Sequence, residues 1–110
     1  MKTLGNEILD EMVRRIVAAL QPRRIYLYGS FAYGQPHENS DVDLFVVTNH
    51  SSLPPHRRAV EVYRALRGLR VPVEVKVVTE AEFERRSHWI SSIERVVEEK
   101  GKILYESPSR

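Results

Sequence analysis

Apolar residues recur at two different spacings along the chain, and the spacing separates helices from strands. Over residues 8–20 they lie three and four positions apart with charged residues between them, which predicts an amphipathic helix that ends before Pro22. The short apolar runs at 25–28 and 41–47 predict two strands. Alternating valines predict a third strand within 71–78, with Glu74 and Lys76 on its opposite face.

Two further helical segments are expected around the third strand. The first is near residues 56–67, with Ala59, Val60, Tyr63 and Leu66 turned inward. The second begins with a capping box formed by Thr79 and Glu82. Helical character is expected to resume from Ser87 with Ile90, Ile93, Val96 and Val97 inward, and Trp89 is expected in the core.

The predicted elements fit a small mixed β-sheet covered by helices. The segment "KILYE" near the end of the chain predicts a final short strand. The resulting order is helix, strand, strand, helix, strand, helix, strand, which indicates an α/β (α+β) fold with a sheet of three to four strands. At 110 residues, the chain is expected to form a single domain over residues 1–110.

Composition narrows the classes of function. The chain has no cysteine, which excludes disulfides and thiolate metal sites, and no apolar run approaches the roughly 18 residues of a membrane span. Because the segment after Lys2 alternates apolar and charged residues, no signal peptide is expected and a cytoplasmic location is the default. The formal net charge is +2, with arginine pairs dispersed among acids, so nucleic-acid binding is not favoured.

Two carboxylates stand at the start of the second predicted strand. Period-two geometry places Asp41 and Asp43 on one face of that strand, with Val42 on the other. Carboxylate oxygens of this kind suit Mg²⁺ or Mn²⁺, and Mg²⁺ commonly binds a few carboxylates together with substrate phosphates. Taken alone, Asp41 and Asp43 could instead be ordinary exposed residues at the end of a loop.

A Gly-Ser pair closes the first predicted strand. The sequence "SFAYG" can begin a short helix at Ser30, whose backbone N–H groups and hydroxyl would receive phosphate oxygens, while Gly29 lets the backbone approach closely. A simple turn with Ser30 as helix cap is the alternative. Glu74 in the third strand is a candidate third acid, with a surface glutamate paired to Lys76 as the alternative.

Taken together, these residues resemble the DNA polymerase β-type nucleotidyltransferase superfamily, and more narrowly its minimal nucleotidyltransferases. The resemblance is carried by Gly29-Ser30, by Asp41-Val42-Asp43 after a gap of ten residues (residues 31–40 lie between them), and by the acid in "VPVEVKVV". It implies the polymerase β-type nucleotidyltransferase fold, metal binding by Asp41 and Asp43, and Glu74 as third ligand or general base. It also implies that Gly29 and Ser30 hold the triphosphate of ATP, with Mg²⁺ or Mn²⁺ as cofactor.

The resemblance also implies a function and a partner. Minimal nucleotidyltransferases commonly pair with a helical HEPN protein encoded nearby, and they neutralise this toxin, often by adenylylating one of its tyrosines. The leading hypothesis is therefore an Mg²⁺-dependent antitoxin that transfers AMP from ATP to a partner hydroxyl. This chain departs from its relatives at Glu74, where Asp is usual, and at Tyr33, where many carry Arg. Two alternatives stay open: a protein that neutralises its partner by binding alone, and a small-molecule nucleotidyltransferase acting as a homo-oligomer.

Overall fold

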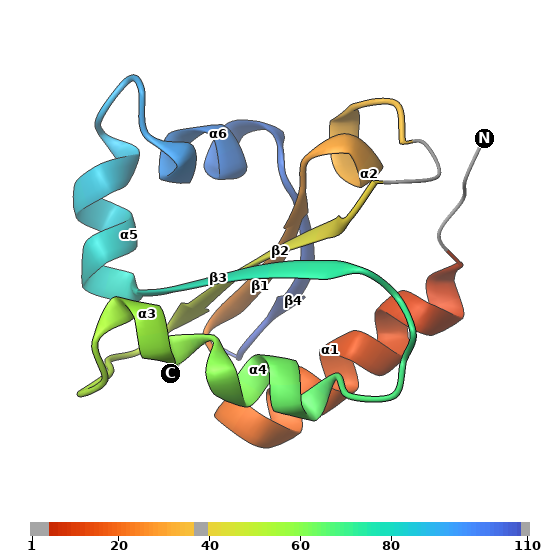
Figure 1. The fold of residues 1–110 in the computed structure, drawn as a ribbon. Coiled ribbons are helices and arrows are strands. Elements are labelled where there is room, and N and C mark those ends of the chain that lie inside the picture. The colour runs from red at the N-terminus through yellow and green to blue at the C-terminus, as the bar shows by residue number, and fades with distance from the viewer. Residues whose placement is uncertain (1–4, 37–39, 109–110) are drawn as a thin grey trace.

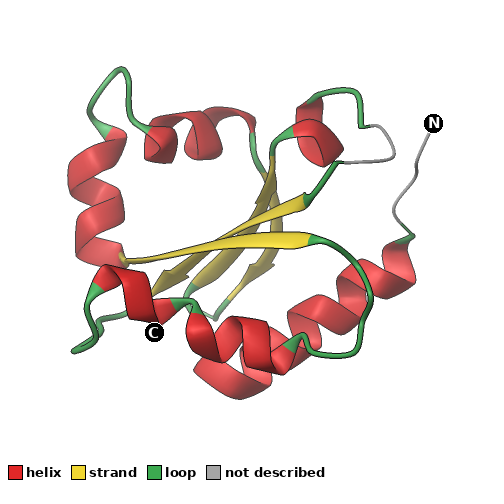
Figure 2. Ribbon diagram, in the orientation of Figure 1, coloured by secondary structure: helices red, strands yellow, loops and turns green. Residues whose placement is uncertain are grey.

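A computed structural model describes residues 5–36 and 40–108 as a four-stranded sheet with helices on both faces. Figure 1 shows α5 and α6 on one side of the sheet and α1 and α4 on the other. Figure 2 shows the same view with helices in red and strands in yellow. The elements are α1 (Asn6–Leu20), β1 (Arg24–Tyr28), α2 (Ser30–Tyr33), β2 (Val42–Thr48), α3 (Pro55–Arg58), α4 (Val60–Ala65), β3 (Val73–Thr79), α5 (Glu80–Ser87), α6 (Ile93–Lys100) and β4 (Lys102–Glu106).

The sheet is mixed, and its strand order is β3-β2-β1-β4. Strand β1 runs antiparallel to both β2 and β4, whereas β2 and β3 are parallel. Helices α3 and α4 make the crossover that a parallel pair requires. Because β2 and β3 run in the same direction, residues near their starts meet at one end of the sheet. The α/β fold with a small mixed sheet covered by helices is thus confirmed.

Each face of the sheet carries its own core. One core holds Ile25, Leu27, Leu44 and Val46 against Met12 and Ile16 of α1 and Val62 of α4. On the other face, the core consists of Tyr26, Phe45, Val47, Val78, Phe83 and Val97. The two sets alternate along every central strand, as period two requires. No helix among the described residues is long and apolar enough to cross a membrane.

The predicted helix near 56–67 is broken at Ala59, and the prediction of its inward face is partly wrong. Val60 and Tyr63 are 41% and 45% exposed, while Val62 and Leu66 are buried. The segment has apolar residues on two sides, and α4 packs on the core through the side that carries Val62 and Leu66. Periodicity alone could not choose between stripes of equal apolar character.

The segment between α5 and α6 also corrects the sequence prediction. Trp89 is 56% exposed and Ile90 is 85% exposed, so neither lies in the core. Helix α5 ends at Ser87, and α6 begins only after Ser92, whose side chain accepts a hydrogen bond from the backbone N–H of Arg95. Since the chain turns between the two helices, its apolar side chains project outward. Val96, also expected inward, is 37% exposed.

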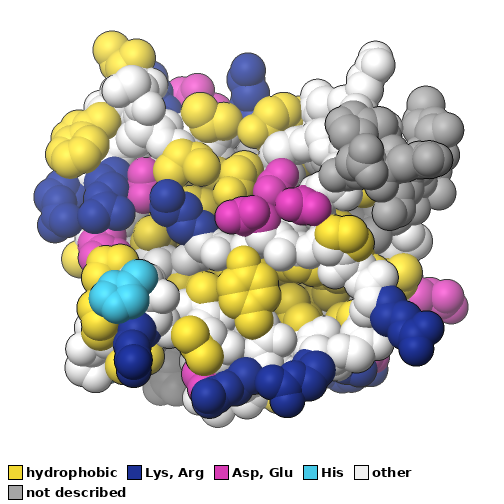
Figure 3. Space-filling model, viewed as in Figure 1, with side chains coloured by type: hydrophobic (Ala, Val, Ile, Leu, Met, Phe, Trp, Pro, Cys, Tyr) yellow, Lys and Arg dark blue, Asp and Glu magenta, His cyan; other side chains and the backbone are white. Residues whose placement is uncertain are grey.

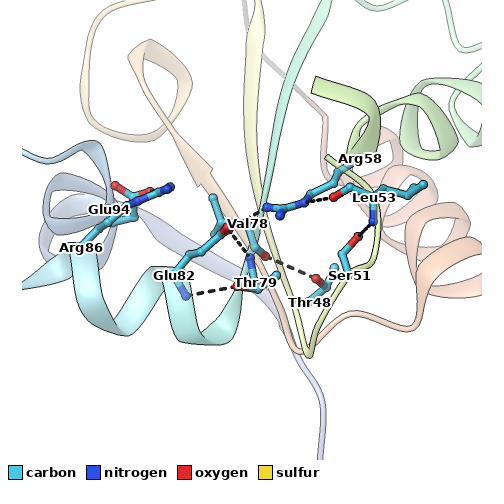
Figure 4. A network of polar contacts seen from close by, with 9 residues as sticks. All are labelled: Thr48, Ser51, Leu53, Arg58, Val78, Thr79, Glu82, Arg86 and Glu94. Atoms are coloured by element: carbon cyan, nitrogen blue, oxygen red, sulfur yellow. Dashed lines mark hydrogen bonds and ion pairs between the residues drawn. The ribbon is translucent and has the colours of Figure 1, made fainter. Parts of the chain in front are cut away.

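The capping box predicted at Thr79 is confirmed, and it belongs to a larger polar network that Figure 4 shows. The backbone N–H of Thr79 donates to the Glu82 carboxylate over 3.0 Å, and Arg58 donates to the same oxygen over 2.7 Å. Arg58 also donates to the Leu53 carbonyl over 3.1 Å. This mostly buried ion pair therefore fastens α3, and the loop before it, to the start of α5.

Candidate active site

Three side chains form a row across the sheet near the start of β2. Strand pairing places Tyr28 opposite Asp43, and Asp43 opposite Glu74 on the parallel strand β3. Paired residues on neighbouring strands point to the same face. The row therefore joins the last residue of β1, the second residue of β2 and the second residue of β3. Asp43 is partly buried and Glu74 is exposed.

Asp41 lies at the edge of this row, just before β2 begins. It is exposed, whereas its neighbour Val42 is buried on the opposite face. The backbone N–H of Val42 donates to the Pro72 carbonyl over 2.8 Å, which ties the start of β2 to the segment entering β3. The backbone thus holds Asp41 and Asp43 near Glu74, although Asp41 stands outside the paired register.

The Gly-Ser turn packs directly against Asp43. Gly29 has φ +75°, and a Cβ atom built on it would lie 2.2 Å from an Oδ2 oxygen of Asp43. Only glycine fits a position that combines a left-handed backbone with so close an approach. The turn and the carboxylate are therefore a single structural unit, which sequence spacing alone could not reveal.

Ser30 occupies the first position of α2. The N-cap of this helix is Gly29, and no side-chain hydrogen bond caps it. The alternative in which Ser30 is the helix cap is therefore wrong. The backbone N–H groups of Ala32 and Tyr33 donate to the Gly29 carbonyl over 3.0 and 3.1 Å, so the turn continues directly into the helix. The helix start at Ser30 that the sequence predicts is confirmed.

The carboxylates influence one another electrostatically. Burial, followed by the nearby charges of Asp41 and Glu74, raises the pKa of Asp43 above its ordinary range. A hard cation would relieve this repulsion, and all three groups offer the oxygen ligands that Mg²⁺ or Mn²⁺ prefers. Within residues 5–36 and 40–108, however, no three His, Asp or Glu side chains converge closely enough to enclose a metal ion as they stand. The residues therefore fit such an ion in their chemistry, but their side chains do not form a ligand set as they stand.

Tyr28 is a member of the row that the sequence analysis missed. Burial, then the charges of Asp43 and Glu74, raises its pKa to about 12, so its hydroxyl remains a neutral hydrogen-bond donor near pH 7. Its ring packs edge-on against Phe45, with centroids 5.9 Å apart, and Phe45 in turn contacts Phe83 of α5. The alternation that put Tyr26 and Tyr28 on one face of β1 was readable from the sequence, but their pairing with Asp43 was not.

Lys76 does not pair with Glu74 among the described residues. Eight ion pairs are formed in this part of the chain, and none includes either side chain. Both are exposed on the same face of β3. The alternative of a surface glutamate neutralised by Lys76 therefore has no support in the structure.

Comparison with known proteins identifies relatives of the whole fold. The family model described as "Nucleotidyltransferase domain" matches residues 8–104. Among solved structures, a proposed nucleotidyltransferase from Sulfolobus solfataricus is similar over 91% of this chain and 78% of its own length, with 20% identity and a TM-score of 0.64. No curated protein gives a significant match.

Two further similar structures come from toxin–antitoxin systems. One is a toxin-antitoxin with AMP-PNP, with 18% identity and a TM-score of 0.60 over 90% of this chain and 73% of that one. The other is a mutant of the toxin-antitoxin MntA-HpeT, with 16% identity and a TM-score of 0.58 over the same shares of the two chains. At these identities the similarity establishes a shared fold.

Proposed function

The chain belongs to the nucleotidyltransferase domain family, and we propose that it is an antitoxin that transfers AMP from ATP to a hydroxyl group of its toxin partner. The partner is proposed to be a helical HEPN-type protein and the accepting group a tyrosine. The observation that carries the proposal is the packing of Gly29 on Asp43, with Glu74 in register on the next strand. The two similar toxin–antitoxin structures, one of them with AMP-PNP, support the choice of partner and nucleotide.

In this proposal the residues of the row, and those beside it, each have a distinct task. Asp41 and Asp43 would hold Mg²⁺ or Mn²⁺, which would offset the negative charge of the triphosphate. The start of α2 at Gly29 and Ser30 would receive phosphate oxygens. Glu74 would take the proton of the accepting hydroxyl, or serve as a third ligand. Tyr28 would donate a hydrogen bond from its neutral hydroxyl towards Asp43 or a phosphate oxygen.

The proposed reaction is an in-line displacement at phosphorus. The oxygen of the accepting hydroxyl forms a bond to the α-phosphorus of ATP, and the bond from this phosphorus to the β-phosphate oxygen breaks. Pyrophosphate leaves with the electron pair, and the hydroxyl proton passes to Glu74. The product is an AMP ester of the partner, formed without any redox step.

Intact-mass measurement tests the proposal. The protein is incubated with ATP, Mg²⁺ and the partner encoded beside it, and both proteins are weighed. We expect the mass of the partner to rise by one or more AMP groups, and Asp41→Asn combined with Asp43→Asn to abolish this rise. Asp10→Asn, which changes an exposed carboxylate of α1, is the matched control and should leave transfer intact. A stable complex with unchanged masses would contradict transfer.

A binding-only antitoxin is the second candidate, because the carboxylates described here do not converge into a finished metal site. Metal-dependent ATP binding separates the two functions. The transferase should bind ATP with Mg²⁺, and the double asparagine variant should not. If both forms ignored ATP yet still bound the partner, neutralisation by contact would be the better account.

A further inference from the structure

The outer side of α4, together with the loop before α3, carries an apolar stripe that no described element covers. Leu53, Val60 and Tyr63 are 44%, 41% and 45% exposed, respectively. The inner side of the same segment is attached to the core through Val62 and Leu66. The outer stripe is therefore not needed to hold the helix in place, and three neighbouring exposed apolar side chains are more than isolated surface positions would explain.

The stripe borders a hollow with cations at its rim. This hollow has a volume of about 440 Å³ and is lined by Leu53, His56, Arg57, Val60, Glu61 and Arg64. Arg57 forms no ion pair with any residue in the described ranges, and Arg64 pairs with Glu61 over 2.8 Å in an exposed contact. Exposed pairs of this kind contribute little stability, so Arg64 can exchange its partner at small cost. The lining thus combines two apolar side chains with two arginines and a single acid, which leaves an excess of positive charge.

Tyr63 lies just outside the lining of this hollow, three residues after Val60 on α4, and its side chain reaches β3. Its hydroxyl accepts a hydrogen bond from the backbone N–H of Val75 over 2.9 Å. Val75 lies between Glu74 and Lys76 on β3, which is an edge strand of the sheet. Figure 3 views this edge: a group of acidic side chains lies at the centre, near β3, with hydrophobic side chains above and below it and basic side chains along the lower rim. A molecule seated in the hollow could therefore extend past Tyr63 to Glu74.

The same hydrogen bond restricts how a partner can bind. An exposed edge strand usually offers its N–H groups to an added strand, but that of Val75 is already occupied by Tyr63. The partner is expected to lie across side chains rather than to extend the sheet. Lys76, exposed and without an ion pair among the described residues, would contribute a cation beside the acids.

We propose that the α3–α4 surface, consisting of Leu53, Arg57, Val60 and Tyr63 with Lys76, docks an acidic, apolar segment of the protein that supplies the accepting hydroxyl. This inference rests on the proposed transfer to a protein partner. Charge complementarity selects this occupant, because Arg57 and Lys76 have no described counter-ion. A second copy would bring the same positive charges face to face.

Fluorescence anisotropy with labelled synthetic peptides tests the docking surface. The probe is an amphipathic peptide of leucines and glutamates with one tyrosine, and its counterpart carries lysines in place of the glutamates. We expect the acidic peptide to bind more tightly. Val60→Glu and Lys76→Glu should each weaken its binding about tenfold, the change that about 1.4 kcal/mol produces.

Matched controls lie on β4, at the opposite edge of the sheet. Ile103→Glu introduces the same charge at an apolar residue that is 54% exposed, and Lys102→Glu reverses the charge of another exposed lysine. Both should bind the acidic peptide as the unaltered protein does. Circular dichroism checks that all four variants are folded, and ATP binding with Mg²⁺ should be the same in Val60→Glu and in both β4 controls as in the unaltered protein.

Several outcomes would overturn the inference. They are equal or tighter binding of the basic peptide, no binding of the acidic peptide, and equal loss in the β4 controls. Preferential binding of a single-stranded RNA oligonucleotide, or a dimer that Val60→Glu dissociates, would assign the surface to another occupant. Because the peptide is measured without ATP, these results are independent of transfer. Peptide binding with no AMP transfer would instead contradict the proposed function.

Discussion

Replacing Gly29 by alanine tests whether the conformation of the Gly-Ser turn determines the position of the Asp43 carboxylate. The added Cβ would be placed 2.2 Å from Oδ2 and 3.1 Å from Cγ of Asp43. Atoms in proteins do not approach so closely, so either the Asp43 side chain or the turn must move. In addition, the φ of +75° at this position is unfavourable for any residue with a side chain.

Gly68 provides a control that separates these two effects. It also has a left-handed backbone, with φ +93°, but no heavy atom lies within 4 Å of a Cβ built there. Gly68→Ala therefore introduces backbone strain alone, which costs about 1–2 kcal/mol. Gly29→Ala introduces similar strain together with the overlap on Asp43, and we expect a total loss of about 2–4 kcal/mol.

Urea unfolding and nucleotide titration together distinguish the variants. Both should unfold at lower urea concentration than the unaltered protein. Only Gly29→Ala should lose Mg²⁺-dependent binding of ATP, because only this change displaces a candidate metal ligand. If Gly29→Ala bound ATP normally, or if Gly68→Ala lost binding to the same degree, the proposed coupling between the turn and Asp43 would be wrong.

Three further predictions concern charge and packing. The Arg58 guanidinium holds the pKa of Glu82 at about 2 instead of its ordinary 4.5, so this carboxylate stabilises the fold above pH 4.5 and loses that effect as pH falls through 2. Chemical denaturation of Glu82→Gln should accordingly show a deficit of about 2–3 kcal/mol at pH 7 that closes near pH 2; a deficit independent of pH would contradict this. Phe83→Ala should lower the free energy of unfolding by about 3–5 kcal/mol, because Phe83 is buried. Trp89→Ala should lower it by under about 0.5 kcal/mol, because Trp89 is exposed. Similar losses in the two variants would contradict the exposed position of Trp89. Asp43→Asn should raise the melting temperature in metal-free buffer, because it removes a partly buried charge that Asp41 and Glu74 repel, and should abolish any stabilisation by Mg²⁺. A lower melting temperature would refute this.

The sequence was sufficient to predict the central elements because their patterns have a single interpretation. Valines alternating around Glu74 could form only one kind of half-buried strand, and the Thr79–Glu82 spacing satisfies a specific pair of backbone donors. The helix over residues 8–20 likewise has one apolar stripe, and it is observed as α1. In each case the local pattern and the tertiary environment favour the same structure.

Elsewhere the pattern allowed two structures, and tertiary contacts decided between them. The segment around α4 has apolar residues on both sides, and the Arg58–Glu82 ion pair helps to fix which side faces the core. Residue type also suggested burial for Trp89. However, Trp89 lies in the turn between α5 and α6, just before the α6 cap Ser92, and its side chain projects outward. No periodicity contains this information, because it depends on where two helices end.

The row of Tyr28, Asp43 and Glu74 shows most clearly why the site could not be assembled from the sequence alone. Asp43 and Glu74 are 31 positions apart, and only the parallel pairing of β2 and β3 makes them neighbours. The sequence could propose both residues by chemistry, but the register that joins them to Tyr28 belongs to the sheet. Burial, followed by the like charges that this register places side by side, raises the pKa of Asp43, so the arrangement opposes stability while Asp43 is charged. Under the proposed function, a cation and a phosphate-bearing substrate would offset this charge when they bind.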